Sequence, residues 1–194
     1  MGGAETFITE PGLMALENPG LYDMGPHLFD LARFFFGEPQ SVYCQTYRSF
    51  GYLKGENIVC SLLRFGDLSC VCEISDIVPY NVFVEGEEGS LVLGTDDSVA
   101  ITTKKGTDVR RYPSPHYPWV SEYDEKKHGI GCINGIVQCN ASLFNAIRTG
   151  QPAETSAEES LKTMRIVNAA LDSSKCVKVI KMDLSVCSLQ KQMC

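Results

Sequence analysis

The sequence has no excess of basic residues and no long apolar run, and these absences exclude two classes of protein. Its 194 residues include 17 Lys and Arg against 24 Asp and Glu, for a formal net charge of −7. Nucleic-acid-binding proteins usually present a face rich in Lys and Arg. No stretch reaches the roughly 18 uninterrupted apolar residues of a membrane span. We therefore expect neither nucleic acid nor a membrane as a partner.

Cysteine is plentiful, but the patterns that give it a structural role are missing. The nine cysteines include no C-x-x-C pair, and no secretory leader is seen in front. Both features favour reduced thiols, and we expect a cytoplasmic protein. Cys70 and Cys72 would share one face of a strand, where a zinc site is conceivable. Because no second pair or histidine lies nearby, core packing is favoured and no metal site is predicted.

A glycine-rich cofactor loop is missing in the context that such a loop requires. Residues 129–135, GIGCING, open a predicted helix and superficially suggest a dinucleotide-binding turn. The fingerprint needs a preceding hydrophobic strand and two residues between its second and third glycines. Here three residues separate them, and the charged run DEKKH comes first. No cofactor-binding residue is therefore assigned.

The sequence does contain one strongly patterned helix, over residues 23–37. Asp23 is a good N-cap residue, Pro26 falls in the first turn, and Gly37 supplies a stop. At about 100° per residue, two stripes lie side by side. The polar stripe comprises Asp23, His27, Asp30 and Phe34, and the apolar stripe, predicted to be buried, comprises Met24, Leu28, Leu31 and Phe35.

The polar stripe could carry acid–base chemistry. A carboxylate one turn away on either side would raise the pKa of His27, whereas the positive end of the helix favours the neutral imidazole. His27 could then titrate near physiological pH. The same spacing also suits a capping Asp23, a half-buried His27 and a solvated Asp30, since such pairs are common on ordinary helices. Spacing alone leaves both interpretations open.

The middle of the chain is predicted to form antiparallel sheet. Gly66–Asp67 and the glycine-bounded stretches 86–89 and 94–97 fit tight turns, which can join only antiparallel strands. Segments rich in β-branched and aromatic residues indicate strands at 41–50, 57–65, 68–78, 80–85, 90–93, 98–103 and 109–112.

A long proline-rich stretch follows at residues 112–131. A loop of this length is often functional, so His116, Tyr117 and His128 are candidate substrate-binding residues on a lid. The alternative is a plain surface excursion.

Two helices and a strand complete the predicted elements. The first helix runs over residues 133–148 and ends at Gly150. The second is predicted to begin at a capping box, Thr155 to Glu158. Its apolar stripe comprises Leu161, Met164, Asn168 and Leu171, and a late strand at 176–181 could return to the sheet.

Three segments, taken together, carry a resemblance to a known family. YDMGPHLFDLARFFFGEPQSV resembles the D-x-G-x-H-x-x-D helix of the Gfo/Idh/MocA oxidoreductases, the group of glucose-fructose oxidoreductase and inositol dehydrogenase. VEGEEGSLVLG is similar to that family's strand–turn–strand. LFNAIRTGQPAETSAEESLKTMRIVNAALDSSK is similar to its terminal helix pair. The resemblance extends from about Gly20 to Met182.

The resemblance implies an α+β fold, with an open, mostly antiparallel sheet, helices packed on one face, and a free face that commonly joins subunits into homo-oligomers such as dimers. It assigns residues 21–182 to the family's C-terminal domain, after an irregular lead-in (1–20) and before a tail (183–194). The family's NAD(P)-binding Rossmann domain and its E-K-P segment have no counterpart here. NAD or NADP is therefore expected in a full-length relative, with no tight binding to this chain.

By the same resemblance, Asp23 and His27 match the family's catalytic aspartate and histidine. His27 would take the hydroxyl proton of a sugar or polyol as hydride leaves for the nicotinamide, and Asp23 would orient the ring or contact a hydroxyl. Asp30 would be a structural partner. The expected function is the substrate-binding and oligomerisation half of an NAD(P)-dependent oxidoreductase, inactive as an isolated chain. Alternatives are a non-catalytic association module from a truncated paralogue or isoform, and a thiol or metal protein.

Overall fold

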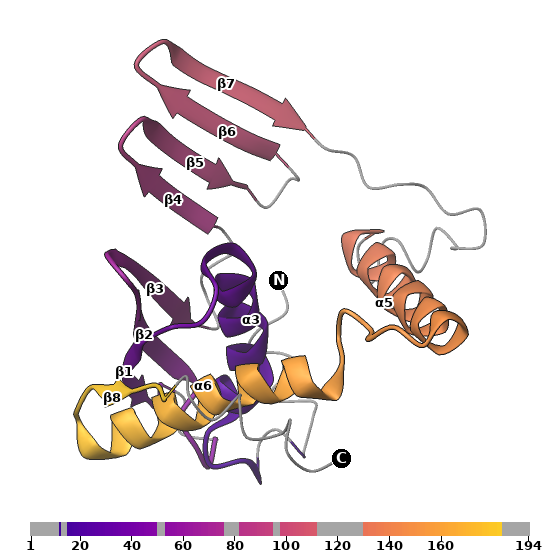
Figure 1. Cartoon of the computed structure of the whole chain (residues 1–194). Helices are drawn as coiled ribbons and strands as arrows, with labels where there is room; N and C mark the ends of the chain where they lie inside the picture. Colours follow the sequence, from indigo (N-terminus) through magenta and orange to yellow (C-terminus); the bar gives the residue numbers. More distant parts are fainter. Residues whose placement is uncertain are drawn as a thin grey trace. The chain divides into compact units, whose positions relative to one another are not determined.

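The structure is a computed structural model that describes Gly12 and residues 15–49, 53–75, 82–94, 98–111 and 130–183. These residues contain eight strands in two sheets together with helices α3, α5 and α6 (Figure 1). All strand pairs in both sheets are antiparallel, so the predicted α+β class is confirmed. The chain divides into two compact units, residues 1–78 with 157–194, and residues 79–156.

Unit 1, formed by residues 1–78 and 157–194, is built on a four-stranded sheet with the order β3-β2-β1-β8. Gly66 has a φ of 57° and, with Asp67, makes the tight turn between β2 and β3, as predicted. The strands are β1 (Ser41–Tyr47), β2 (Ile58–Phe65), β3 (Leu68–Ile74) and β8 (Ile180–Lys181).

Two helices cover one face of this sheet (Figure 1). A single π-turn, η1 (Gly20–Met24), leads directly into α3 (Gly25–Phe36), and α6 (Ala157–Cys176) packs on both α3 and β1. Strict alternation along β2 buries Val59, Ser61, Leu63 and Phe65 beneath the helices and exposes the residues between them. The predicted arrangement, helices on one face and an open opposite face, is confirmed in unit 1.

The predicted apolar stripe of α3 is confirmed only in part: Met24 and Leu28 are partly buried against the core, but other residues of the helix are buried more deeply. The buried residues of this helix are Gly25, Phe29 and Ala32, whereas Phe35 is 53% exposed. Apolar side chains surround most of the helix, so hydrophobicity alone does not select a face. Phe29, the largest of these side chains, is fully buried in the core cluster with Ala32.

The predicted stripe of α6 is also confirmed only in part, with Met164 partly buried against the core. Leu161 is 48% exposed and Asn168 is exposed, although Leu171 is buried. The face toward the sheet is built instead from small residues and β-branched aliphatics. Its buried members are Thr163, Ile166, Val167, Ala169, Ala170, Leu171 and Ser173.

Small residues on this face let α6 pack closely on the sheet. The Ser173 hydroxyl accepts a hydrogen bond of 2.9 Å from the backbone N–H of Cys44 in β1.

The late strand is shorter than predicted. Because α6 continues to Cys176 and turns at Val177, with φ of 53°, only Ile180–Lys181 pairs with β1. The helix begins at Ala157, so the residue before it is Ser156, one position after the predicted cap at Thr155.

Unit 2, residues 79–156, contains the second antiparallel sheet, order β4-β5-β6-β7, and one long helix. The predicted turn at residues 86–89 joins β4 to β5, whereas residues 95–97 lie outside the described ranges. Gly150, at φ 70°, ends α5 as predicted. The elements are β4 (Val82–Gly86), β5 (Gly89–Leu93), β6 (Ser98–Thr103), β7 (Gly106–Arg111) and α5 (Ile130–Thr149).

Two further findings concern membrane-spanning helices and metal sites. Among the described residues, no helix is both long and apolar enough to cross a membrane. In the same ranges, no three His, Cys, Asp or Glu side chains come together as metal ligands would.

The alternation along β2 predicts very different costs for two neighbouring leucines. Leu63 is fully buried in the core, and Leu62, on the opposite face, is 44% exposed. Leu63→Ala should lower the free energy of unfolding by about 2–5 kcal/mol because it leaves a cavity. Leu62→Ala should cost less than about 1 kcal/mol. Urea titrations followed by circular dichroism measure both, and equal losses would contradict the assigned faces.

Candidate active site

The helix that carries Asp23 and His27 begins earlier than predicted, and this changes the position of Asp23. The helical run starts at Gly20 with the π-turn η1, in which the N–H of Gly25 bonds the carbonyl of Gly20. Asp23 therefore lies inside the helix and does not cap it. The residue at the N-cap of α3 is Met24, which makes no side-chain cap hydrogen bond.

Pro26 gives a physical reason for the wide turn. A proline has no N–H, and its ring clashes with the carbonyl four residues earlier, here that of Tyr22. A π-turn opens the backbone at this point, so the helix passes the proline without breaking. Single π-turns inside helices occur frequently at functional sites. This feature therefore marks the segment that carries Asp23 and His27.

Asp23 and His27 lie on successive turns at the start of the helical run. Asp23 is half-buried and His27 is exposed. Within the described ranges, neither side chain takes part in a hydrogen bond or ion pair, with each other or with Asp30. The carboxylate partners expected on either side of His27 are thus not seen. An exposed neutral imidazole can accept a proton from an approaching hydroxyl group.

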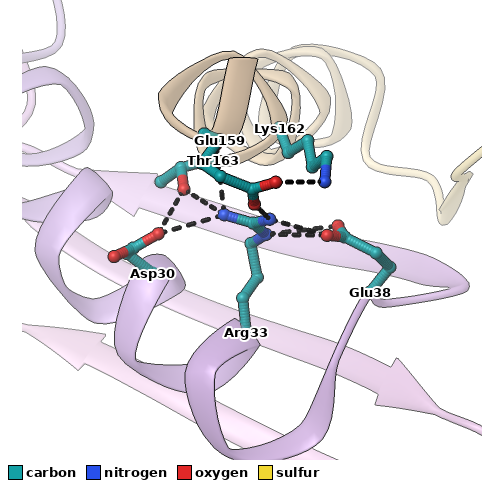
Figure 2. Close-up of polar contacts among 6 residues, drawn as sticks. All are labelled: Asp30, Arg33, Glu38, Glu159, Lys162 and Thr163. Carbon is teal, nitrogen blue, oxygen red and sulfur yellow. Dashed lines mark hydrogen bonds and ion pairs between the residues drawn. The ribbon is translucent and has the colours of Figure 1, made fainter. Parts of the chain in front are cut away.

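The strongest polar cluster of the helix lies two turns further on, around Arg33 (Figure 2). Its Nη1 donates to Asp30 Oδ1 at 3.0 Å and to Thr163 Oγ1 at 2.8 Å. Its Nη2 donates to Glu38 Oε1 at 2.6 Å and to Glu159 Oε2 at 3.0 Å. The Thr163 hydroxyl in turn donates to Asp30 at 2.6 Å. These bonds connect α3 to α6.

The charges of this cluster are well matched. The Arg33 side chain is only 8% exposed, and the hydrogen bonds that it donates to Glu38 raise its pKa against the lowering effect of burial. A hydrogen bond from Lys162, followed by that from Arg33, lowers the pKa of Glu159. A buried guanidinium needs such partners, since an unpaired buried charge is strongly destabilising. Asp30 is therefore a structural residue that helps hold α3 on α6.

The sequence did not reveal Arg33 as the central residue. The spacing of Asp30 and Arg33, three residues apart on a helix, is only weakly indicative of an ion pair. The partners on α6 are 126 and 130 residues away in the sequence, and spacing cannot reveal them.

The remaining predicted site residues are not placed. His116, Tyr117 and His128, the predicted substrate-binding residues, lie outside the described ranges. An open polar hollow of about 530 Å³ beside the start of η1 includes Glu17 and Lys54 in its lining, but neither Asp23 nor His27. The catalytic candidates therefore stand on an exposed helix surface.

Comparison with known proteins agrees with the resemblance. Residues 15–92, which include Asp23 and His27, match the family model of the GFO/IDH/MocA C-terminal domain. This segment is therefore similar to that domain family. The match covers the π-turn, α3 and all the strands from β1 to β4.

Two curated relatives cover most of the chain. A D-apiose dehydrogenase from Paraburkholderia graminis is 27% identical over 88% of this chain and 47% of its own length. The scyllo-inositol 2-dehydrogenase (NADP+) IolW from Bacillus subtilis is 25% identical over 84% of this chain and 49% of its own length. The chain thus spans about half the length of these relatives.

A solved structure shows the same fold. An oxidoreductase from Agrobacterium radiobacter, crystallised with NAD+, L-tartaric acid and magnesium, superposes with a TM-score of 0.81 at 20% identity. The superposition covers 92% of this chain and 54% of that protein.

The described strands do not provide a dinucleotide cradle. Such a cradle places the pyrophosphate at a helix N-terminus between parallel strands of a βαβ unit. Every strand pair within the described ranges is antiparallel, and the strands within each hairpin are joined by tight turns. The described residues therefore do not by themselves fit NAD(P).

The Arg33 cluster predicts that substitution of Arg33 lowers the free energy of unfolding much more than substitution of Arg64, an arginine outside the cluster. Arg33→Met should lower the free energy of unfolding by about 2–3 kcal/mol, less than for a fully buried pair because the carboxylates retain contact with water. Arg33→Lys should retain only part of this free energy of unfolding, because an ammonium group cannot make the paired hydrogen bonds of a planar guanidinium group.

Arg64→Met is the matched control, because the side chain of Arg64 is 46% exposed and its carboxylate partner, Asp67, lies 3.7 Å away. It should change stability by less than about 0.5 kcal/mol. Similar losses for the Met variants at positions 33 and 64 in urea titrations would contradict a central role for Arg33.

Proposed function

We propose that this chain forms the substrate-side half of an NAD(P)-dependent oxidoreductase that oxidises a sugar, polyol or related alcohol. The carrying observation is the family match over residues 15–92, because it includes the helix segment with Asp23 and His27. The names of the two curated relatives, which act on D-apiose and scyllo-inositol, support the substrate class.

In this proposal His27 is the general base. Oxidation of an alcohol removes the hydroxyl proton as hydride leaves the same carbon, so a base must lie within hydrogen-bond reach of that hydroxyl. The exposed imidazole of His27 meets the need for access. Asp23, one turn earlier and half-buried, would accept a hydrogen bond from a neighbouring hydroxyl and so orient the ring.

The hydride acceptor, NAD or NADP, would be held outside the described residues. Positioning of two reactants contributes roughly 7–11 kcal/mol to lowering a barrier, and that contribution needs both sites in one assembly. We therefore expect the isolated chain to be inactive. We also expect it to act in the cytoplasm.

A chimera tests this function. The chain is joined to the remaining half of the D-apiose dehydrogenase from P. graminis, which the family resemblance predicts to hold NAD(P). The chimera should reduce NAD+ or NADP+ with D-apiose or with a polyol, measured by absorbance of the reduced nicotinamide. His27→Gln should lower kcat by about 10²–10⁴-fold, the usual contribution of a general base.

The matched control for Asp23 is Asp67→Asn, which changes an aspartate in the exposed β2–β3 turn and should leave kcat and KM unchanged. Asp23→Asn should impair turnover. A folded chimera with full activity after His27→Gln would contradict the role of His27, and turnover by the isolated chain would contradict its inactivity.

A second candidate function is association without catalysis, and the open face of the unit 1 sheet favours it. Tyr43, Leu62 and Val71 lie opposite one another on three adjacent strands. Leu62 is 44% exposed and Val71 is 65% exposed, so an apolar row crosses the face. A second copy of the chain, bringing the same row, would cover this surface and give a homodimer.

Charge placed in the row tests the association. Leu62→Glu should shift the chain from dimer to monomer at micromolar concentration in sedimentation experiments, because it would bury an unpaired carboxylate. Glu73→Gln, an exposed position on the same face of β3, is the control and should leave the dimer intact. A monomeric wild-type chain would contradict association through this face.

A further inference from the structure

One pair of reactive side chains plays no part in the proposed function. Cys70 and Cys72 lie on the core-facing side of β3, where they are opposite Leu63 and Ser61 of β2. Cys72 is 7% exposed and Cys70 is half-buried. Their side chains turn toward each other, with the two sulfur atoms 3.8 Å apart.

The two thiols have different chemistry. A hydrogen bond from Cys72 lowers the pKa of the Cys70 thiol to about 7, against the opposing effect of burial. The same contact, together with burial, raises the pKa of Cys72. Cys70 is therefore the nucleophile of the pair near neutral pH, because the thiolate is the reactive form. Cys72 remains a protonated thiol beside it.

We propose that Cys70 and Cys72 form a peroxide-reactive dithiol, in which Cys70 is oxidised first and Cys72 closes a reversible disulfide within β3. The oxidant class is a hydroperoxide, with hydrogen peroxide as the simplest member. Because Cys70 is half-buried, a small neutral oxidant reaches its sulfur more readily than a bulky disulfide does.

The reaction balances in two steps. The Cys70 thiolate attacks one oxygen of hydrogen peroxide and breaks the O–O bond, which gives a sulfenic acid and, after proton uptake, one water. The Cys72 sulfur then attacks the Cys70 sulfur, displaces the hydroxyl as a second water and loses its proton. The two thiols are oxidised by two electrons in total, and the peroxide is reduced.

Strand geometry makes this disulfide reducible. Residues two apart on a strand have Cα atoms about 6.6–6.8 Å apart, at the upper end of the range that a disulfide spans. Closing the bond therefore requires β3 to bend. Among the described strands β3 is paired only with β2, so bending disrupts one ladder. Strained disulfides have less negative reduction potentials and are readily reduced.

The core also offers an internal comparison. Cys44, on the same face of the sheet, is fully buried, and its sulfur lies 3.2 Å from the Ser61 hydroxyl. Burial raises the pKa of the Cys44 thiol. Cys44 should therefore resist peroxide while the pair on β3 reacts.

Peptide mapping of the full chain tests the proposal. The folded protein is treated with stoichiometric hydrogen peroxide, alkylated with N-ethylmaleimide, and digested with trypsin. The tryptic peptide of residues 65–104 contains Cys70 and Cys72 and no other cysteine. We expect this peptide to escape alkylation and to weigh two hydrogen atoms less than its reduced form. After reduction with dithiothreitol and a second alkylation, it should carry two labels.

Variants distinguish the two roles. In Cys72→Ser the sulfenic acid at Cys70 should persist and be trapped by dimedone, whereas Cys70→Ser should give neither product. Cys60→Ser, which removes an exposed thiol on the opposite face of β2, should leave the disulfide yield unchanged. Full alkylation of both residues in the wild-type peptide, or pairing of Cys70 with another cysteine, would overturn the proposal. The wild-type map decides even where a variant fails to fold.

Discussion

The position of α3, which carries His27, depends on one guanidinium group. Arg33 is almost fully buried between α3 and α6, and a buried charge is tolerated only where partners surround it. Its planar fork bonds Asp30 on its own helix, Glu38 just beyond it, and Thr163 and Glu159 on α6. Because these bonds have fixed directions, they determine how α3 is rotated against α6. The helix surface that carries His27 is thereby fixed as well.

A second constraint acts at the other end of the helix. Pro26 cannot donate a hydrogen bond, and the π-turn at Gly20–Met24 accommodates it without a break. The turn begins where Gly20 lies against β2, and a Cβ there would come within 3.0 Å of the Asn57 carbonyl oxygen. The start of the helix is thus held by the sheet and its end by Arg33. Asp23 and His27 lie between these two points of support.

Turn chemistry and β-branched or aromatic composition predicted the strands well, because both act between residues close in sequence. Gly66–Asp67 determined a hairpin, and β-branched runs gave strand bounds within a few residues. The faces of the helices were not predictable in the same way. Large apolar residues such as Leu161 and Phe35 were predicted to be buried but are exposed. The smaller Ala170 and Ser173 are buried instead, because they allow close packing. Tertiary packing, which the local sequence does not encode, made that selection.

The division of labour in the proposed reaction follows from the same topology. A proton acceptor needs only one exposed side chain on a firmly held helix, and a hairpin sheet with two covering helices provides that. A dinucleotide needs a helix N-terminus aimed between parallel strands, and sheets made of antiparallel hairpins cannot create one. A segment with this topology can therefore contribute substrate contacts and proton transfer. Binding of the hydride acceptor then requires a sheet with parallel strands, whether on the same protein or on another.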